Sequence, residues 1–186
     1  MTTQTQSRPE SGTKIDSTVY TRFAEVLTYP RQGYHRIIQQ TGSLLKEIRI
    51  NDPEPFLNFA GETGQMEVKE LEELYTRTFD LNEKRPLEVG WHLYGERYQR
   101  GEFLVQMRDR LREYGITESG ELPDHLTHCL QLLSRMDTGE REDFISDALL
   151  PAVKSIQQGF TDENPYQGVI ESLITILETE TGGDNE

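Results

Sequence analysis

The stretch SGELPDHLTHCL, from Ser119 to Leu130, places an aspartate and two histidines close together after a proline. Asp124, His125 and His128 could hold a metal ion or exchange protons, because carboxylate and imidazole groups do both. A dinuclear metal site in a helical bundle requires Glu-x-x-His pairs, and a zinc site requires further histidines or cysteines. The chain has four histidines, one cysteine and no Glu-x-x-His pair. A metal-dependent enzyme built on a helical bundle is therefore the less favoured alternative.

Motifs for nucleophilic catalysis and for nucleotide binding are missing from the sequence. It contains no Gly-x-Ser-x-Gly, no Walker loop and no Gly-x-Gly-x-x-Gly. The one cysteine, Cys129, falls within an expected helix, where a buried structural thiol is the favoured interpretation. The residues alone therefore indicate an acidic helical domain that is not an enzyme and holds no metal.

The chain carries a formal net charge of -14, from 19 Lys and Arg residues against 33 Asp and Glu residues. A field of that sign repels phosphate groups, which argues against nucleic acid and anionic membranes as partners. The same field attracts basic partners, including basic peptides, although an excess of acidic residues also simply keeps a protein soluble. A basic segment is thus the kind of partner that the charge favours.

Length and composition favour a single domain. A chain of 186 residues suits one hydrophobic core. Residues 1–14 and 179–186 are polar and lack periodic apolar positions, so we expect them to be disordered tails around an all-helical domain at 15–178. A single cysteine favours a reducing compartment, and neither a leader motif nor an apolar run of ~18 residues is present. These features predict a cytoplasmic protein without a membrane-inserted segment.

Apolar residues recur with a helical period along nearly the whole chain. The pattern predicts an all-α, single-domain bundle of about seven or eight helices. The expected helices cover about 17–29, 34–50, 53–59, 65–79, 97–114, 123–136, 139–158 and 165–177. Residues 80–90 are expected to form a loop, and the aromatic segment 91–95 has no clear assignment. Gly115 is expected to cap a helix C-terminus, and Pro151 to kink the helix that contains it.

Two further groups of residues have alternative interpretations. Five arginines lie between Arg97 and Arg112, but acidic residues are interleaved with them, which favours a solvated helix face with local ion pairs over a phosphate-binding strip. Aromatic residues gather at Tyr75, Phe79, Trp91 and Tyr94. They are either ordinary core residues or the lining of a groove that grips a peptide.

Three segments, taken in order, resemble a known family. They are ELYTRTFD at 73–80, LYGERYQRG at 93–101 and ELPDHL at 121–126. Their order and spacing are similar to the nitrate reductase delta-subunit family of NarJ-type chaperones, within the broader class of redox-enzyme maturation chaperones that includes TorD and DmsD proteins. The resemblance implies an all-helical fold, no catalytic activity and a cytoplasmic assembly factor for a molybdenum enzyme.

The resemblance also implies a partner and a cargo. Such chaperones bind the N-terminal or leader peptide of the catalytic subunit of a molybdenum oxidoreductase. They assist insertion of the molybdenum cofactor (molybdopterin guanine dinucleotide) into that subunit, before membrane docking or export, without binding the cofactor stably themselves. A general helical peptide-binding adaptor, serving partners unrelated to molybdenum enzymes, is the main alternative.

The resulting site hypothesis joins the motif to the aromatic residues. Apolar residues of the peptide are expected to enter a groove lined by the aromatic residues, and Glu96 lies in the second of the three segments. Asp124, expected to be exposed at a helix N-terminus with Pro123 in the first turn, would meet a peptide arginine. His125 would be a second polar contact, and His128 would lie on the surface. The expected peptide-binding residues are Tyr75, Phe79, Trp91, Tyr94, Glu96, Asp124 and His125. The plain alternative is that Asp124 and His125 only cap the helix.

Overall fold

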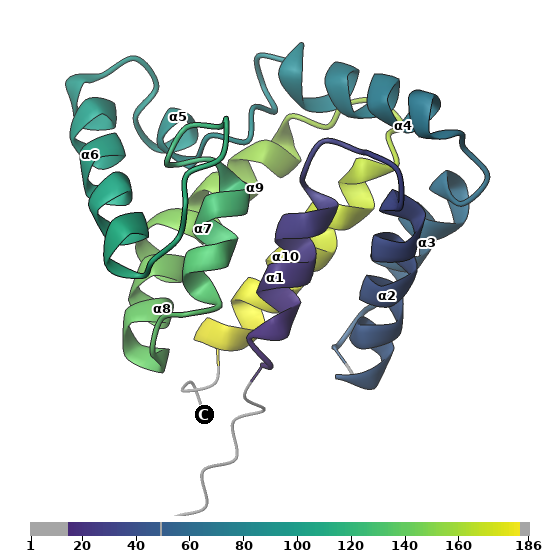
Figure 1. Ribbon diagram of the computed structural model, residues 1–186, viewed down its shortest axis with the longest axis horizontal. Coiled ribbons are helices and arrows are strands. Elements are labelled where there is room, and N and C mark those ends of the chain that lie inside the picture. Colours follow the sequence, from purple (N-terminus) through teal and green to yellow (C-terminus); the bar gives the residue numbers. More distant parts are fainter. Residues whose placement is uncertain (1–14, 49, 183–186) are drawn as a thin grey trace, which may run out of the picture.

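The computed structural model describes residues 15–48 and 50–182, and over these residues the protein is entirely helical, without a strand (Figure 1). The elements are α1 (Thr18–Val26), α2 (Tyr34–Glu47), α3 (Glu54–Thr63), α4 (Val68–Tyr75), η1 (Thr76–Asp80), α5 (Val89–Tyr94), α6 (Tyr98–Glu113), α7 (Leu126–Leu133), α8 (Thr138–Phe144), η2 (Ile145–Leu149), α9 (Leu150–Gln158) and α10 (Tyr166–Thr181). The two η segments are π-helical continuations, so the elements join into nine continuous helices, and only α5 is shorter than seven residues. The prediction of an all-α bundle is confirmed.

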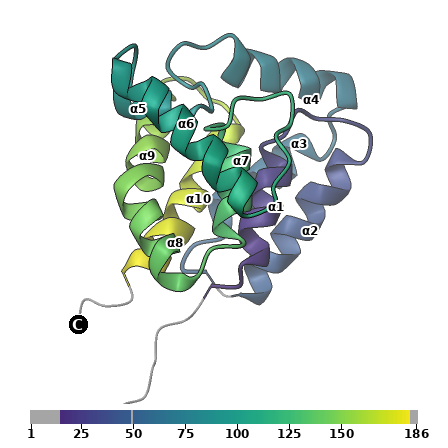
Figure 2. The ribbon, with the colours of Figure 1, turned by 60° about the vertical axis from the view of Figure 1, so that its left-hand side comes forward.

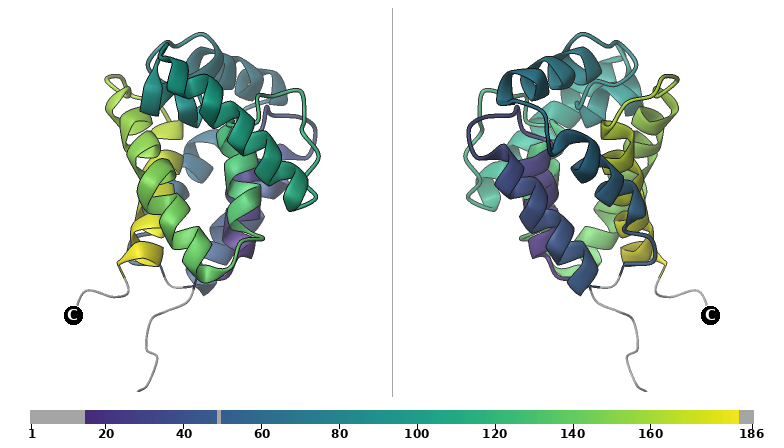
Figure 3. Two further views of the ribbon diagram at one scale, coloured as in Figure 1. Left: turned by 90° about the vertical axis from the view of Figure 1, so that its left-hand side faces the viewer. Right: turned by 90° about the vertical axis from the view of Figure 1, so that its right-hand side faces the viewer.

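The core is arranged around α10 and α1. Helix α10 packs against α3 and α9, and α1 packs against α2 and α7. In Figure 1 the helices α2 and α3 flank this centre on the right, and α7, α8 and α9 flank it on the left. Helices α4 and α5 close one end of the bundle, whereas α1 begins and α10 ends at the other. Figure 3 shows α6 running obliquely across the outside of the layer that contains α7 and α8.

Local signals explain several of the helix ends. The Asp16 carboxylate accepts the Thr18 N–H at 2.9 Å before α1, and Glu67 and Glu70 form a capping box at the start of α4. Gly115 follows α6 with a φ of +63°, as a glycine C-cap requires. The aromatic segment that had no assignment forms α5.

The helix that contains Pro151 shows how the chain accommodates a proline. Helix α8 runs through η2 into α9, and the π-helical turn ends at Leu149, just before Pro151. Proline cannot donate a backbone hydrogen bond, and π turns widen a helix where its regular ladder is interrupted. The expected irregularity therefore takes the form of a π segment.

Buried aromatic rings fill the centre between α1, α3, α4, η1 and α10. Tyr166 lies at its middle, with ring centroids 5.0 Å from Phe79 and 5.9 Å from Tyr75. The Tyr34 hydroxyl hydrogen-bonds to the Tyr166 hydroxyl at 2.9 Å, and the Tyr75 hydroxyl donates to the Leu27 carbonyl at 2.9 Å. The buried phenols of Tyr34, Tyr75 and Tyr166 thus have polar partners, whereas the buried Tyr20 hydroxyl has none among the described residues.

A buried ion pair ties the end of the chain to the bundle. Arg141 of α8 meets Glu180 of α10 at 2.8 Å, with only 7% and 4% of the two side chains exposed. Arg141 also donates to the carbonyls of Leu133 and Met136. The expected C-terminal tail boundary at 178/179 is therefore wrong, because residues 179–181 are helical and Glu180 is part of the packed structure. Residues 1–14 and 183–186 lie outside the described residues.

We expect Glu180→Ala to lower the free energy of unfolding by about 3–5 kcal/mol, because it leaves the Arg141 charge buried without its counter-charge. Glu178→Ala is the matched control on the same helix. Its pair with Lys154 is about half exposed on both sides, and such pairs contribute about 0–1 kcal/mol. Urea unfolding of the two variants measures the difference, and equal losses would show that the buried pair has no special role.

Candidate functional site

The candidate site is built where two short extended segments meet. Residues on either side of Glu88 pair with residues on either side of His125 in an antiparallel bridge. The Val89 N–H donates to the Asp124 carbonyl at 3.0 Å, and the Leu126 N–H donates to the Leu87 carbonyl at 2.7 Å. This bridge fixes the start of α5 beside the start of α7, although the two helices are far apart in the sequence.

Asp124 lies inside this junction and is fully buried. Its Oδ2 accepts the Gly90 N–H at 2.8 Å, whereas its buried Oδ1 has no hydrogen-bond partner among the described residues. Burial raises the pKa of Asp124, and the Gly90 N–H and the positive charge of Arg100 oppose that rise. The expectation of an exposed carboxylate that meets a peptide directly is wrong, because the Asp124 side chain is buried and bonded to the backbone of α5.

Gly90 is required at this point by close packing. A Cβ atom at Gly90 would lie 2.7 Å from Asp124 Oδ2 and 2.9 Å from the Phe103 ring. Contacts that short do not occur in folded proteins unless a neighbour moves. The absence of a side chain at Gly90 therefore lets the buried carboxylate reach the backbone of α5.

The two histidines of the opening motif are structural. His125 is the N-cap of α7: its Nδ1 accepts the Thr127 N–H at 3.4 Å. Burial lowers the pKa of His125 to about 4, with the nearby His128 adding to the effect. His128 is 1% exposed, donates from Nδ1 to the Leu122 carbonyl at 2.8 Å, and accepts the Ser119 N–H at Nε2. The surface position expected for His128 is wrong.

The start of α7 also differs from the expectation. Pro123 and Asp124 form a turn before the cap, and the helix begins at Leu126. Pro123 therefore does not occupy the first helical turn. The histidine ring, rather than the aspartate, satisfies a free N–H of the helix start. Among the residues that the structure describes, no group of three or more metal-ligating side chains forms a metal site.

Acidic side chains gather around this junction. Burial raises the pKa of Glu88, and the charges of Asp124 and Glu121 raise it further, against the opposing effect of Arg100. Burial also raises the pKa of Tyr75 well above its usual value, and Asp80, Glu121 and Glu88 contribute to that rise. We call the four carboxylates that take part in these interactions, those of Asp80, Glu88, Glu121 and Asp124, the acidic rim.

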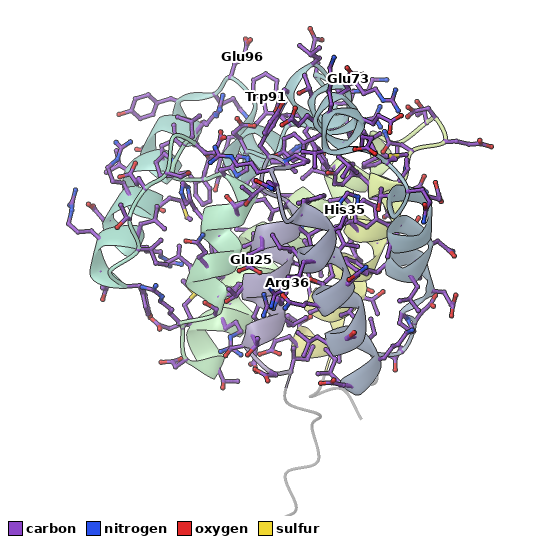
Figure 4. All side chains as sticks on the ribbon, turned by 45° about the vertical axis from the view of Figure 1, so that its right-hand side comes forward. Glu25, His35, Arg36, Glu73, Trp91 and Glu96 are labelled. Atoms are coloured by element: carbon purple, nitrogen blue, oxygen red, sulfur yellow. The ribbon has the colours of Figure 1, made fainter. Side chains whose placement is uncertain are left out.

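The expected aromatic residues separate into two groups. Tyr75 and Phe79 are 4% and 3% exposed and belong to the core around Tyr166, not to an open groove. Trp91 and Tyr94 of α5 are half-buried, and Tyr94 packs on Phe103 with ring centroids 5.7 Å apart. Glu96 is exposed in the turn after α5. Figure 4 shows Trp91 and Glu96 at the same end of the bundle.

A cavity of about 300 Å³ opens beside Trp91, and its lining is mostly polar. It is lined by Glu83, Lys84, Trp91, His92, Ser155, Gln158 and Gly159. Among the lining residues, His92 has its Nε2 2.7 Å from the Pro86 carbonyl and its Nδ1 2.9 Å from the Ser155 hydroxyl. The Pro86 carbonyl can only accept, so Nε2 carries the proton and Nδ1 accepts from Ser155. Sequence reasoning missed this pair, because residues 63 positions apart give no spacing signal.

Arg100 of α6 also contacts Trp91. Its guanidinium carbon is 5.3 Å from the centroid of the indole ring, within the range of a cation–π contact. Its Nε is buried without a hydrogen-bond partner among the described residues. The interleaved acids predicted ion pairs for this helix, and Arg112 does pair with Asp109 and Arg108 with Glu118. Arg100 is the exception that the pattern did not single out.

Comparison with known proteins places this site in a family. Residues 49–166, more than half of the chain, match the family model described as nitrate reductase delta subunit. The chain belongs to the nitrate reductase delta-subunit family. The matched region contains all three of the segments that suggested it, together with the acidic rim, Trp91 and Arg100.

Individual relatives agree with the family. The chain is 26% identical over 132 residues to nitrate reductase molybdenum cofactor assembly chaperone NarJ of Escherichia coli strain K12, and equally to that of Escherichia coli O157:H7. These matches cover 68% of this chain and 54% of the relatives, so the chain spans about half the length of the curated relatives it matches. Both relatives are named as assembly chaperones.

A solved structure shares the fold. A crystal structure of a proposed redox enzyme maturation protein from Archaeoglobus fulgidus superposes with a TM-score of 0.62 at 19% sequence identity. The superposition covers 89% of this chain and 94% of that one. No described helix of the present protein is both long and apolar enough to cross a membrane.

We expect Asp124→Ala to destabilise the protein by about 1–3 kcal/mol, because it leaves the buried Gly90 N–H without an acceptor. Asp124→Asn is the matched control, since an amide oxygen can still accept that bond. Its loss should be clearly smaller. Urea unfolding of both variants tests this, and a similar small loss in both would mean that the Asp124–Gly90 bond does not hold α5 in place.

We expect the stability of the protein to fall between about pH 6.5 and about pH 4 through His125. Its folded pKa of about 4 lies below the ordinary 6.5, so the unfolded chain binds more protons in that window and stability rises with pH. The contribution is full above 6.5, is lost as the pH falls toward 4, and amounts to at most about 3 kcal/mol.

His125→Asn is the matched control for this titration, because asparagine also caps a helix N-terminus but does not titrate. Unfolding free energies of both proteins across the window measure the effect. The carboxylates titrate in both proteins, so their contributions largely cancel in the difference. A difference that does not change with pH would contradict the role of His125.

Proposed function

We propose that this protein is an assembly chaperone that binds the N-terminal peptide of the catalytic subunit of a molybdenum enzyme related to nitrate reductase. It keeps that subunit ready for insertion of the molybdenum cofactor before membrane docking or export. The family match over residues 49–166 is the observation that carries the proposal. The names of the Escherichia coli relatives, which describe molybdenum cofactor assembly, support it. The cofactor is cargo for the client subunit and is not held stably by the chaperone.

The surface around α5 supports binding of a peptide. Trp91 and Tyr94 are half-buried, Tyr98 at the start of α6 is 80% exposed, and Leu122 in the loop before Asp124 is 42% exposed. Exposed apolar side chains of this size provide anchoring positions for an amphipathic segment. In this proposal the peptide contacts Trp91, Tyr94 and Glu96 directly.

The buried members of the expected site have a supporting role in the same proposal. Tyr75 and Phe79 belong to the core beneath η1, while Asp124 and His125 fix the junction that carries α5. They position the contact surface without lying on it. In this proposal the segment 121–126 affects peptide binding through the position of α5, although the Asp124 carboxylate is buried.

Charge supports a basic segment as the bound peptide. Glu88 of the acidic rim is the N-cap residue of α5, the helix that carries Trp91, and the whole chain carries a net charge of -14. Carboxylates around a half-buried aromatic ring attract and orient an arginine or lysine side chain. Micromolar affinity corresponds to about -8.2 kcal/mol, which a few apolar anchors and one basic contact can supply. Such an affinity suits a chaperone that must release its client.

The primary test is capture of the client from the native cytoplasm under conditions in which the reductase is made. Mass spectrometry should identify the catalytic subunit of a molybdenum enzyme, and its N-terminal peptide in excess should release it. Capture of unrelated proteins, none of them a molybdenum-enzyme subunit, would favour the general helical adaptor instead.

We expect Trp91→Ala to weaken binding of that N-terminal peptide by about tenfold or more, because half-buried tryptophans are typical anchors of an interface. Val105→Ala, which trims another apolar side chain that is 58% exposed on α6, is the control and should change affinity little. Fluorescence anisotropy with a labelled peptide gives both dissociation constants. Equal effects of the two variants would show that the peptide does not bind at α5.

A further inference from the structure

Arg100 is half-buried, and it is held differently from the buried Arg141 of the core. Arg141 donates to two backbone carbonyls and forms an ion pair with Glu180. Arg100 takes part in none of the ion pairs among the described residues, and its buried Nε has no acceptor there. Among the described residues, its guanidinium lies over the ring of Trp91. Burying a guanidinium nitrogen without an acceptor costs free energy, so the placement of Arg100 requires an explanation.

Asp124 also has a buried polar atom without a hydrogen-bond partner among the described residues. It is fully buried, and its Oδ1 lacks a donor, just as Arg100 Nε lacks an acceptor. Both side chains pass over the same glycine: a Cβ atom at Gly90 would lie 2.7 Å from Asp124 Oδ2 and 3.5 Å from Arg100 Cγ. The charge of Arg100 also opposes the rise in pKa of both Asp124 and Glu88. A cation therefore lies beside two carboxylates without closing a bond to either.

Carboxylates outnumber arginines in the neighbourhood of Arg100. The charges of Asp124 and Glu121 both act on Glu88, and Arg100 acts on both Glu88 and Asp124, with His128 also acting on Asp124. An indole face with carboxylates beside it is a general recognition site for a guanidinium group. Arginine fits such a site better than lysine, because its planar group stacks on the ring while its edge meets the carboxylates.

Helix α6 can release Arg100 more easily than a core helix could. Its main packing partners are α5 and α7, and it lies across the outside of the bundle in Figure 2. Its first residue, Tyr98, is 80% exposed. Movement of the first turn of α6 would therefore disturb few buried contacts while withdrawing Arg100 from the Trp91 ring.

We propose that Arg100 is a resident substitute for a basic side chain of the client: it occupies the place between Trp91, Glu88 and Asp124 in the free protein, and a peptide arginine displaces it. This inference rests on the proposed function and names the residue that sets the specificity of its site. Because one guanidinium replaces another, the net gain from the contact is small. The exchange therefore favours arginine-containing segments while it keeps binding reversible.

The test compares two synthetic amphipathic peptides of roughly 16 residues that differ at one position, arginine in one and its neutral analogue citrulline in the other. Arg100→Gln should bind the arginine peptide about three to ten times more tightly than the unaltered protein does, the range expected for one partly desolvated cation–π contact. Binding of the citrulline peptide should not change. Arg100→Lys keeps a resident cation that fits the site less well, so its affinity for the arginine peptide should lie between those of the unaltered protein and Arg100→Gln, while the citrulline peptide binds as before.

Arg108→Gln is the control for overall charge. It removes one arginine from the same helix, and the pair that Arg108 forms with Glu118 is partly exposed. Arg100→Gln and Arg108→Gln therefore have the same net charge. An equal effect of the two variants would overturn the inference, as would weaker binding of the arginine peptide by Arg100→Gln. Thermal unfolding of each variant verifies that it is folded.

A second readout separates this inference from the proposed function. Trp91 is the only tryptophan in the chain, so its indole N–H gives a single NMR signal. N-acetyl-arginine amide should shift that signal more in Arg100→Gln than in the unaltered protein, and N-acetyl-citrulline amide should shift it in neither. If the peptides do not bind but the arginine amide behaves so, the peptide-binding proposal fails and the cation site stands. If the arginine amide shifts both proteins equally, the cation site fails.

Discussion

The bond between the buried Asp124 carboxylate and the Gly90 N–H is the constraint on which the candidate site depends. Together with the backbone bridge between segments 87–89 and 124–126, it holds α5 against the start of α7. Helix α5 carries Trp91 and Tyr94, and α6 packs on α5, so the position of every accessible residue of the site follows from this junction. A carboxylate can be kept there only because Gly90 has no side chain to exclude it.

Electrostatics give the junction its chemical character. Asp124 and Glu88 are partly or fully removed from water, where ionised carboxylates are costly unless a donor or a cation is near. The junction offers one backbone donor and the charge of Arg100, which leaves one carboxylate oxygen without a partner. A chaperone must recognise its client and then release it. A site that is poorly satisfied when empty, and in which the proposed exchange replaces one cation by another, would suit that cycle better than a rigid ion pair.

Much of the architecture was predictable from the residues. The helical period of the apolar positions gave an all-α bundle, and Gly115 was recognised as a helix end, because these signals act within a few residues along the chain. The three ordered segments were sufficient to predict the nitrate reductase delta-subunit family. The separation of Tyr75 and Phe79 from Trp91 and Tyr94 was not predictable, since the same aromatic residue serves equally well in a core or at a surface until its neighbours are known.

The sequence by itself therefore determined the fold class and the family. Only the tertiary structure decided how the candidate site is built. It buries Asp124 and His128, makes His125 a helix cap, and brings Arg100 over Trp91. The physical reason is that exposure and pairing of a polar group depend on segments that pack on it from distant parts of the chain. Here the start of α5 packs on a carboxylate that local helix rules would leave in water.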